Sequence, residues 1–347
     1  MVSEQQLSDA MDTALQTAQR GHRGANPLVG ACILDEHGSL IATGYHQGAG
    51  TPHAEIDALR RLGRISRERA ATLSMVVTLE PCNHTGRTGP CSAAIAQAGI
   101  GAVHYAVGDH TSASGGADYL AAAGIKVSQA RHTTSTRELN HRWFRAKEQG
   151  RPFITVKTAQ SLDGRINAPD GTSQWITSAE SRAHAHSLRA RVDAIVIGTN
   201  TVIHDDPRLN ARTADGTALP RQPHRLVMGQ RDLPGRLALA FDEHWEQVRT
   251  REVHQLVSRA SELGYGHLLI EGGASIASAF IAADLADEIY CYQAPIIIGA
   301  GDSSVNLATT HTLGDARAFR IDAFSNETLH RLGPDVLLHL EPLPRPL

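Results

Sequence analysis

Hydrophobic residues along the first part of the chain follow two spacings, one typical of helices and one typical of buried strands. Residues 8–21 place apolar side chains at helical spacing, with Ser8 as the predicted N-cap and Gly21 after the helix end. The segments that follow predict strands at 29–35 and 40–46, a helix at 51–63 with Pro52 in its first turn, a strand at 71–82, a helix at 89–100, a strand at 101–109, and a helix then a strand within 117–127. This order predicts a central sheet with helices packed on it.

A charged stretch with Gly and Pro at residues 145–153 interrupts the pattern and predicts a linker. We therefore divide the chain into two domains, residues 1–147 and 148–347, which also suits a length of 347 residues. Strand-like runs then resume at 153–166, 192–202, 224–229, 266–273, 288–298 and 335–340, with helical segments at 178–191 and 274–287. The second half is therefore expected to be another α/β domain, ending in a loose Pro-rich tail at 341–347.

The composition narrows the class of protein. With 41% hydrophobic and 20% charged residues the chain resembles ordinary globular proteins, and a formal net charge of -3 argues against a dedicated nucleic-acid surface. No apolar run is long enough to span a bilayer, and the first 21 residues lack the basic start and apolar core of a signal peptide. We therefore expect a cytoplasmic protein with no membrane partner.

Two of the four cysteines bracket a Gly-rich loop in "EPCNHTGRTGPC", residues 80–91. A disulfide, a metal site and a redox pair are the three candidates, and a reducing compartment weakens the first. The upstream motif "PHAE" adds His53, which with Cys82 and Cys91 makes a three-ligand zinc set that leaves a fourth position for water. All three residues fall at predicted strand-to-helix junctions, where the partial positive charge of a helix N-terminus favours a thiolate.

Glu55, two residues after His53, could reach a water at such a metal from the first turn of its helix and act as a proton shuttle. The alternative is structural, because buried cysteines are common in cores and His53 could simply cap its helix. Cys32 and Cys291 lie in apolar strand-like runs and are expected to be core residues.

Three motifs then carry a specific resemblance. His-x-Glu followed by Pro-Cys is typical of zinc nucleobase deaminases, although eight residues separate the two cysteines here. "NPLVG", "GYHQGAGTPHAE" and "TLEPCNHTGRTGPC" together resemble the deaminase half of the bifunctional riboflavin-biosynthesis deaminase–reductase family. "KTAQSLDGRI", "SQWIT", "GTNTVIHDDPRLNAR", "EGGASIASAF", "APIIIG" and "GPDVLLHL" resemble its reductase half, in order.

This resemblance implies a cytidine-deaminase-like N-terminal domain and a dihydrofolate-reductase-like C-terminal domain. It implies zinc-dependent deamination of a diaminopyrimidine ribosylamino 5′-phosphate, followed by NADPH-dependent reduction of the ribosyl group to ribityl. The partner is thus a small pyrimidine phosphate and not a nucleic acid. We also expect a homo-oligomer, of a size that the sequence does not specify.

The resemblance also implies roles for individual residues of the deaminase half. Zinc would be bound by His53, Cys82 and Cys91, with Glu55 as the catalytic residue, and the pocket would be lined by Asn26, His46, His84 and Arg87. An Asn can read a pyrimidine edge and an Arg can pair with phosphate.

In the reductase half, Lys157, Ser161 and Asp163 follow a strand, and Lys157 or Asp205 is expected to assist proton transfer. The implied substrate positions are Ser173, Arg189, Leu209, Arg212 and Glu271, and the two arginines suit a phosphate. The implied cofactor positions are Ala159, Trp175, Thr201, Asp205, Gly273, Ala274, Ser275, Ile276, Ala277, Ser278 and Ala279. Bare backbone at the start of a helix suits the cofactor phosphates, and the lack of a Gly-x-Gly-x-x-Gly motif in this half predicts a non-Rossmann mode of NADPH binding.

The sequence departs from the family pattern in three places. The loop "DHTSASGGADYL" after the strand that ends at Asp109 lacks the usual Asp-Pro-Asn-Pro, Ile296 stands where Lys is common, and Asn210 stands where Thr is usual.

Two rival functions stay open on the residues alone. A nucleic-acid base deaminase would leave residues 151–347 without a role, and a binding protein with a structural zinc would need a fourth protein ligand, for which His84 is the nearest candidate.

Overall fold

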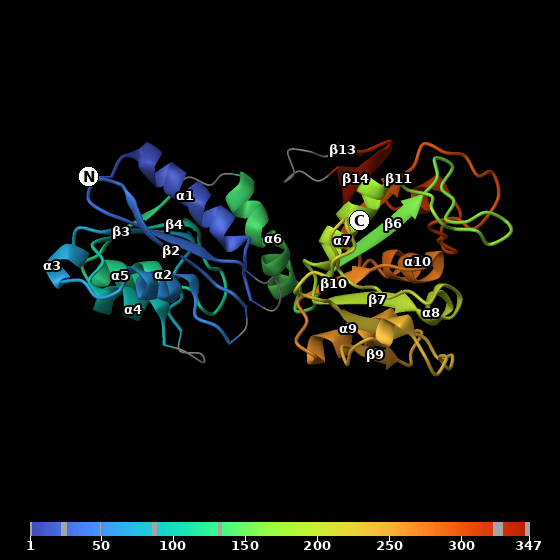
Figure 1. Cartoon of the computed structure of the whole chain (residues 1–347), viewed down its shortest axis with the longest axis horizontal. Helices are drawn as coiled ribbons and strands as arrows, with labels where there is room; N and C mark the ends of the chain where they lie inside the picture. Colours follow the sequence, from blue (N-terminus) through green and yellow to red (C-terminus); the bar gives the residue numbers. More distant parts are fainter. Residues whose placement is uncertain are drawn as a thin grey trace. The chain divides into compact units, whose positions relative to one another are not determined.

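The computed structural model divides the chain into two compact units, Met1–Lys147 and Glu148–Leu347. Figure 1 shows the helices and strands of both units. The structure describes residues 2–21, 26–48, 50–84, 89–130, 134–321 and 329–343.

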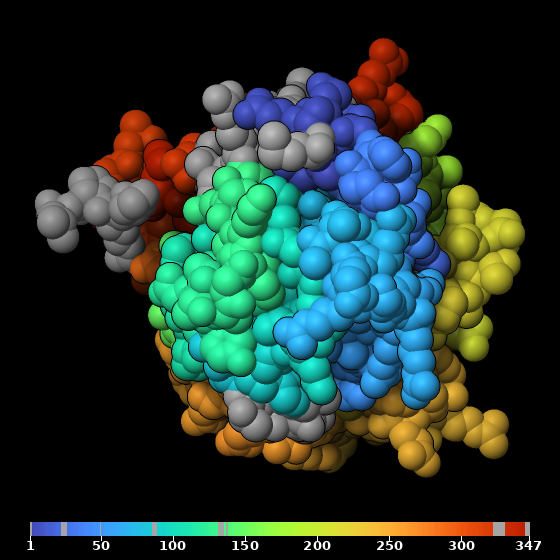
Figure 2. Space-filling model, turned by 90° about the vertical axis from the view of Figure 1, so that its left-hand side faces the viewer, coloured from blue at the N-terminus to red at the C-terminus, as the bar shows by residue number. Residues whose placement is uncertain are grey.

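The N-terminal unit is built on a five-stranded sheet in the order β2-β1-β3-β4-β5. Its strands are β1 (Gly30–Leu34), β2 (Leu40–Tyr45), β3 (Ser74–Leu79), β4 (Ala102–Val107) and β5 (Lys126–Gln129), and its helices are α1 (Glu4–Ala18), α2 (Ala54–Leu62), α3 (Arg67–Ala70), α4 (Cys91–Ala98), α5 (Gly116–Ala122) and α6 (Thr134–Gln149). Strand β1 pairs antiparallel with β2 and β3, whereas β3, β4 and β5 are parallel. Figure 2 shows one face of this unit, on which the light-blue segment that includes α3 and the green segment that includes α5 both lie.

Alternate residues of the buried strands face opposite layers of helices, as the two-residue repeat of a strand requires. Ala31 and Ile33 of β1 pack in the core that also holds buried residues of α2, α4 and α5. Cys32 and Leu34 pack on the other face with α1 and with Leu139 of α6. The prediction that Cys32 is a core residue is therefore confirmed, and burial raises the pKa of its thiol to about 12.

The predicted helix boundaries need three corrections in this unit. Helix α1 begins at Glu4, because Ser3 rather than Ser8 forms a capping box with Gln6. Pro52 precedes the N-cap of α2 and is not in its first turn. The predicted linker begins too early, since residues 145–149 form the last turn of α6.

The second unit is built on a nine-stranded sheet in the order β12-β14-β11-β6-β10-β7-β8-β9, with β13 paired to β14. Its strands are β6 (Phe153–Gln160), β7 (Ala194–Gly198), β8 (His224–Met228), β9 (Trp245–Val248), β10 (His267–Ile270), β11 (Glu288–Gln293), β12 (Phe319–Ile321), β13 (Leu329–Leu332) and β14 (Asp335–Pro342). Its helices are α7 (Ala179–Arg189), α8 (Thr199–Asp205), α9 (Val253–Glu262) and α10 (Ala274–Ala282), with short 3-10 turns at Ala238–Ala240 and Leu313–Asp315.

Six consecutive strands of this sheet, from β11 to β9, are parallel, and β14 closes one side antiparallel to β11. One face is covered by α9 and α10, and Cys291 is a core residue there, as expected. The other face is covered by α7. Because the six strands run in one direction, their carboxyl ends meet along a single edge, where open α/β sheets bind ligands.

The long apolar runs of this half are shorter as strands than the pattern predicts. Strand β6 ends at Gln160, where the chain turns into a loop in which Ser161 donates to Asp163 at 2.7 Å. The run 192–202 changes from strand β7 to helix α8 at Thr199. Within the parts of the chain that the structure describes, no helix combines the length and apolar character needed to cross a membrane.

Asn140 of α6 supports the start of the first sheet. Its side chain mimics a backbone partner, accepting from the N–H of Leu28 and donating to the C=O of Leu28, both at 2.8 Å. Replacing Asn140 with Leu should leave both buried groups unpaired and destabilise the N-terminal unit by about 2–4 kcal/mol. Calorimetric melting measures this loss. The exposed Ser135→Ala change on the same helix should cost less than about 0.5 kcal/mol, and an unaltered melting profile for Asn140→Leu would contradict this role.

Candidate active sites

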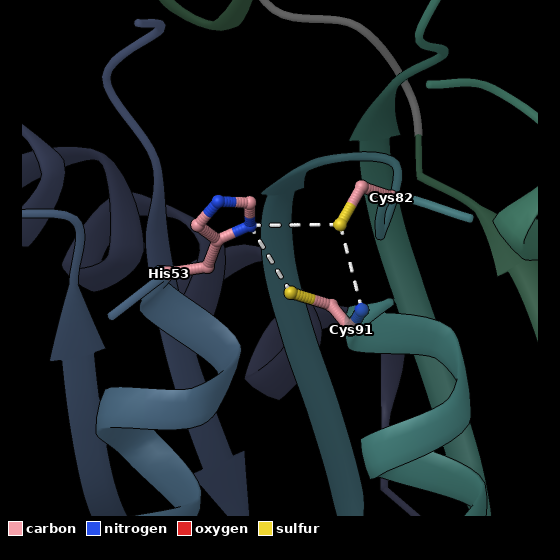
Figure 3. A group of neighbouring side chains, drawn as sticks. All are labelled: His53, Cys82 and Cys91. Carbon is pink, nitrogen blue, oxygen red and sulfur yellow. Dashed lines mark hydrogen bonds between the residues drawn. The ribbon is translucent and has the colours of Figure 1, made fainter. Parts of the chain in front are cut away.

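Three side chains from separate elements meet in the N-terminal unit. His53 is the N-cap of α2, Cys82 lies three residues after β3, and Cys91 is the first residue of α4. Nδ1 of His53 lies 3.5 Å from Sγ of Cys82 and 3.2 Å from Sγ of Cys91, and Figure 3 shows the ring and the two thiols pointing toward one another. The three ligand atoms lie within 4.8 Å of one another.

This spacing fits a zinc ion. Ligand atoms of a tetrahedral site with Zn–S near 2.3 Å and Zn–N near 2.0–2.1 Å are about 3.5–3.8 Å apart. One imidazole nitrogen and two sulfurs match the donor set, and within the described part of the chain the cluster holds three residues and does not include His84. His84 is exposed, so the rival with a fourth protein ligand finds no support in it.

The surroundings favour a thiolate at Cys82. The Cys91 N–H donates to Sγ of Cys82 at 3.4 Å, and the Ser92 N–H donates to the Cys82 carbonyl at 3.2 Å. A hydrogen bond from the Cys91 thiol, opposed by burial and aided by His53, lowers the pKa of Cys82 to about 4. The same pairing and burial raise the pKa of Cys91, because a second thiolate would repel the first. A bound divalent cation would stabilise both.

Glu55 is 3% exposed in the first turn of α2. Burial, together with the charge of Cys82, raises the pKa of this carboxyl to about 7. A group with a pKa near the working pH can both take up and release a proton, which is the requirement for a shuttle. The structure thus brings Glu55 to the metal cluster despite its two-residue offset from His53.

His46 and Asn26 form a hydrogen-bonded pair beside the cluster. Nδ1 of His46 lies 3.0 Å from the Pro52 carbonyl, which only accepts, so Nδ1 carries the proton. Nε2 of His46, 3.0 Å from Nδ2 of Asn26, then accepts from the amide, and the imidazoles of His46 and His53 meet edge to face at 5.4 Å. The Asn26 side-chain oxygen therefore stays available to read a donor on a substrate. Arg87 lies outside the described residues.

Glu80 supports this site, a role that the sequence motifs did not predict. Its carboxylate accepts from the N–H groups of Asp109, Gly115 and Ala117 at 3.0–3.2 Å, so it ties the loop after β4 to the segment that carries Cys82. A Cβ on Gly116 would lie 1.7 Å from the Pro81 carbonyl, so this close approach requires glycine. The loop that departs from the family pattern is thus packed directly against the metal-ligand segment.

A cavity of about 1670 Å³ opens at the carboxyl ends of the parallel strands of the second unit. The predicted residues that line it are Lys157, Ala159, Ser173, Arg189, Thr201, Asp205, Leu209, Glu271 and the stretch Gly273 to Ala279. Trp175 and Arg212 are not among the lining residues. Trp175 is 64% exposed under the guanidinium of Arg182, and Arg212 is hydrogen-bonded to His186.

A buried carboxylate organises one wall of the cavity. Glu271 Oε2 lies 2.6 Å from Nη2 of Arg189, and Oε1, which has no hydrogen-bond partner among the described residues, lies 3.9 Å from Nζ of Lys157. Burial alone would raise the pKa of Glu271, but the two cations outweigh it and lower that pKa. Burial lowers the pKa of Lys157.

Backbone forms another part of the lining. Gly273 precedes helix α10 with φ of 46°, and Gly273, Ala274 and Ser275 line the cavity at the start of this helix, while the Ile276 N–H donates to the Gly273 carbonyl. A helix N-terminus bare of side chains suits the phosphates of a dinucleotide.

Comparison with known proteins agrees with both sites. Residues 4–107 match the family described as cytidine and deoxycytidylate deaminase zinc-binding region, and residues 152–328 match the RibD C-terminal domain. The riboflavin biosynthesis protein RibD of Mycobacterium tuberculosis is 38% identical over 340 residues, covering 96% of this chain and 97% of that protein. This chain belongs to the RibD family.

Solved structures agree over the full length. RibD of Acinetobacter baumannii superposes with a TM-score of 0.85 at 31% identity, covering 99% of this chain and 100% of that one. A diaminohydroxyphosphoribosylaminopyrimidine deaminase/5-amino-6-(5-phosphoribosylamino)uracil reductase from Thermotoga maritima superposes at 0.84 with 25% identity, covering 98% and 99%.

As a RibD family member the chain is a bifunctional enzyme of riboflavin biosynthesis, with a zinc-binding deaminase region and an NADPH-dependent reductase region. The expected fold class, a deaminase-like α/β domain followed by a reductase α/β domain, is confirmed. The rival of a nucleic-acid base deaminase is excluded, because the second half matches a reductase.

Zinc content tests the ligand set. Wild-type protein purified without chelator should hold about one zinc per chain. Cys91→Ser should lose most of it, because a hydroxyl is a poor substitute for a thiolate. Cys291→Ala removes a buried thiol away from the cluster and should retain zinc, as elemental analysis would measure. Full zinc content in Cys91→Ser together with normal deamination would refute the assignment.

Proposed function

We propose that residues 1–147 deaminate 2,5-diamino-6-(5-phosphoribosylamino)pyrimidin-4-one hydrolytically. Residues 148–347 then reduce the ribosyl group of 5-amino-6-(5-phosphoribosylamino)uracil to ribityl with NADPH. The observation that carries the first assignment is a buried Glu55 beside three convergent zinc-type ligands. The second assignment is supported by the cavity at the strand ends and by the family match of residues 152–328.

In the deaminase, His53, Cys82 and Cys91 hold the zinc, which when bound lowers the pKa of a coordinated water to about 7. Glu55 takes a proton from the attacking water and delivers it to the departing amine, so that water is consumed and ammonia released. Asn26, oriented by His46, reads the pyrimidine edge, and His84 and Arg87 complete the pocket. Water access to Glu55 is limited by its burial, which keeps its pKa suited to both steps.

In the reductase, Gly273 to Ala279 and the side chains of Ala159, Trp175, Thr201 and Asp205 hold the cofactor, which when bound supplies a hydride to C1′ of the sugar. Ser173, Leu209, Arg212 and the Arg189–Glu271 pair hold the substrate. Lys157 donates the accompanying proton. This role suits an amine whose pKa burial has lowered, because it gives up its proton more readily than an exposed lysine.

We place this activity in the cytoplasm, because no disulfide joins the four cysteines, which suits a reducing compartment. The homo-oligomer expected from the family resemblance stays a prediction. Ammonia release and NADPH oxidation, followed separately on the diaminopyrimidine phosphate, test both halves of the proposal.

Glu55→Gln separates the two chemistries. The amide keeps the size of the side chain but cannot shuttle a proton, so deamination should fall roughly a hundredfold to ten-thousandfold. Zinc content should persist because Glu55 is not a ligand, and reduction of supplied deaminated substrate should continue near the wild-type rate. Full-rate ammonia release by the variant would refute the shuttle. Loss of reduction as well would refute independent sites.

Gly273→Leu tests the cofactor site. A Cβ at this position would lie 3.2 Å from Oγ1 of Thr201, and a larger side chain would enter the phosphate-binding face. NADPH binding should weaken roughly tenfold or more, as fluorescence titration would measure. The matched control is Gly264→Leu, where φ is 78° and the space is open, so it also places a side chain at positive φ but away from the cavity. Equal NADPH affinity in the two variants would contradict the placement.

A further inference from the structure

The loop that follows α8 has two strained positions. Asp206 and Leu209 have φ values of 38° and 53°, in the left-handed region that residues other than glycine rarely adopt. Such strain persists only where surrounding contacts hold the backbone in place, and it gathers at ligand sites. Leu209 is buried and lines the reductase cavity, and Arg212 follows three residues later.

Two side chains of α7 hold this loop through one backbone group. The Asn210 carbonyl accepts from Nδ1 of His186 at 3.0 Å and from Nη1 of Arg189 at 3.1 Å. Gln222 holds the next residue, because its amide accepts from the Ala211 N–H and donates to the Ala211 carbonyl, both at 2.8 Å.

His186 also contacts Arg212 directly. Nε of Arg212 donates to Nε2 of His186 at 3.1 Å. A carbonyl can only accept and a guanidinium can only donate, so a ring between them must carry its proton on Nδ1 and a lone pair on Nε2. Burial, with the charges of Arg189 and Arg212, lowers the pKa of His186 to about 4, so the ring is neutral at physiological pH as this arrangement requires.

The two arginines are not equally available to a ligand. Arg189 uses Nε and Nη2 on Glu271 and Nη1 on Asn210, so all three nitrogens have partners. Arg212 is exposed, and the hydrogen bond it makes within the described residues uses Nε alone. Its two Nη groups are therefore the ones free to form a fork on a phosphate.

We propose that His186 is a positioning residue, which fixes the strained loop through Asn210 and orients the guanidinium of Arg212 toward the 5′-phosphate of the reductase substrate. His186 touches no reacting atom, and its effect passes through Arg212. This inference rests on the proposed function, in which Arg212 belongs to the substrate site of the reductase.

The experiment compares substrates that differ only in the phosphate. NADPH oxidation is followed with 5-amino-6-(5-phosphoribosylamino)uracil and with its dephosphorylated counterpart, and the ratio of the two kcat/KM values measures phosphate recognition. Three variants dissect the contacts. Arg212→Gln removes the guanidinium that would bind the phosphate. His186→Asn keeps a donor for the Asn210 carbonyl but loses the acceptor for Arg212. The longer side chain in His186→Gln can again offer an acceptor to Arg212.

We expect Arg212→Gln and His186→Asn to lower the ratio roughly ten- to hundredfold, through KM for the phosphorylated substrate with kcat little changed. His186→Gln should lose less than His186→Asn. The NADPH dissociation constant, measured by fluorescence, should stay near the wild-type value in all three. The matched control is His184→Gln, which removes another bonded imidazole of α7, paired with Tyr292 at 2.7 Å, and should leave the ratio unchanged.

The outcomes separate the inference from the function on which it rests. If Arg212→Gln lowers the ratio and neither His186 variant does, the positioning role is overturned while the substrate site stands. If Arg212→Gln leaves the ratio unchanged, the phosphate site itself is misplaced and the inference falls with it. If the His186 variants weaken both substrates and NADPH equally and lower the melting temperature, the residue is merely structural and the inference is overturned.

Discussion

The Cys91 backbone N–H, at the first position of α4, donates to the sulfur of Cys82, and the chemistry of the deaminase depends on this contact. The first N–H groups of a helix have no partner within the helix and carry partial positive charge, so they stabilise an anion placed against them. Here the anion is the thiolate of Cys82, three residues after β3, and a second helix, α2, begins directly after His53, whose ring contacts the same sulfur. The same property is available at the start of α10, where Gly273 leaves the backbone bare for phosphates. In both domains, therefore, the N-terminus of a helix that follows a strand can stabilise a negatively charged group.

In the reductase domain, the buried carboxylate of Glu271 determines how the neighbouring cations are used. Removing Glu271 from water is costly unless cations compensate it, and Arg189 and Lys157 do so from α7 and β6. This requirement occupies Arg189 and leaves Arg212 as the more available cation. The same helix α7 that supplies Arg189 also supplies His186, so the loop after α8 and the buried carboxylate are held by one helix. Removing one partner of such a buried ion pair lowers the free energy of unfolding by about 3–5 kcal/mol. We therefore expect these residues to contribute to stability as well as to ligand binding.

Much of the fold was accessible from pattern alone. The buried strands β1, β3, β7 and β10 are continuous apolar runs between turn signals, and the helices α2, α4 and α10 begin beside recognisable motifs. The pattern failed where tertiary contacts decide the outcome. Residues 145–149 are charged and precede Gly150, yet they remain helical because α6 is anchored through Leu139 and Asn140. Thr199, Thr201 and Val202 are β-branched, yet they lie in helix α8, which begins directly after β7.

By itself the sequence indicated the candidate zinc ligands, the candidate shuttle Glu55 and the order of the two domains, because the functional groups of His, Cys and Glu suit these roles and their motifs are local. The tertiary structure alone decided which groups are free to act. Only packing shows that Glu55 is buried beside the cluster, that Glu80 ties a loop to the metal segment, and that Arg189 is occupied by Glu271. The role of His186 belongs to the same class, since a histidine at helical spacing has no distinguishing motif. Its tautomer depends on Asn210 and Arg212, which lie more than twenty residues away in the chain and are brought to it by the packing of the loop after α8 against α7.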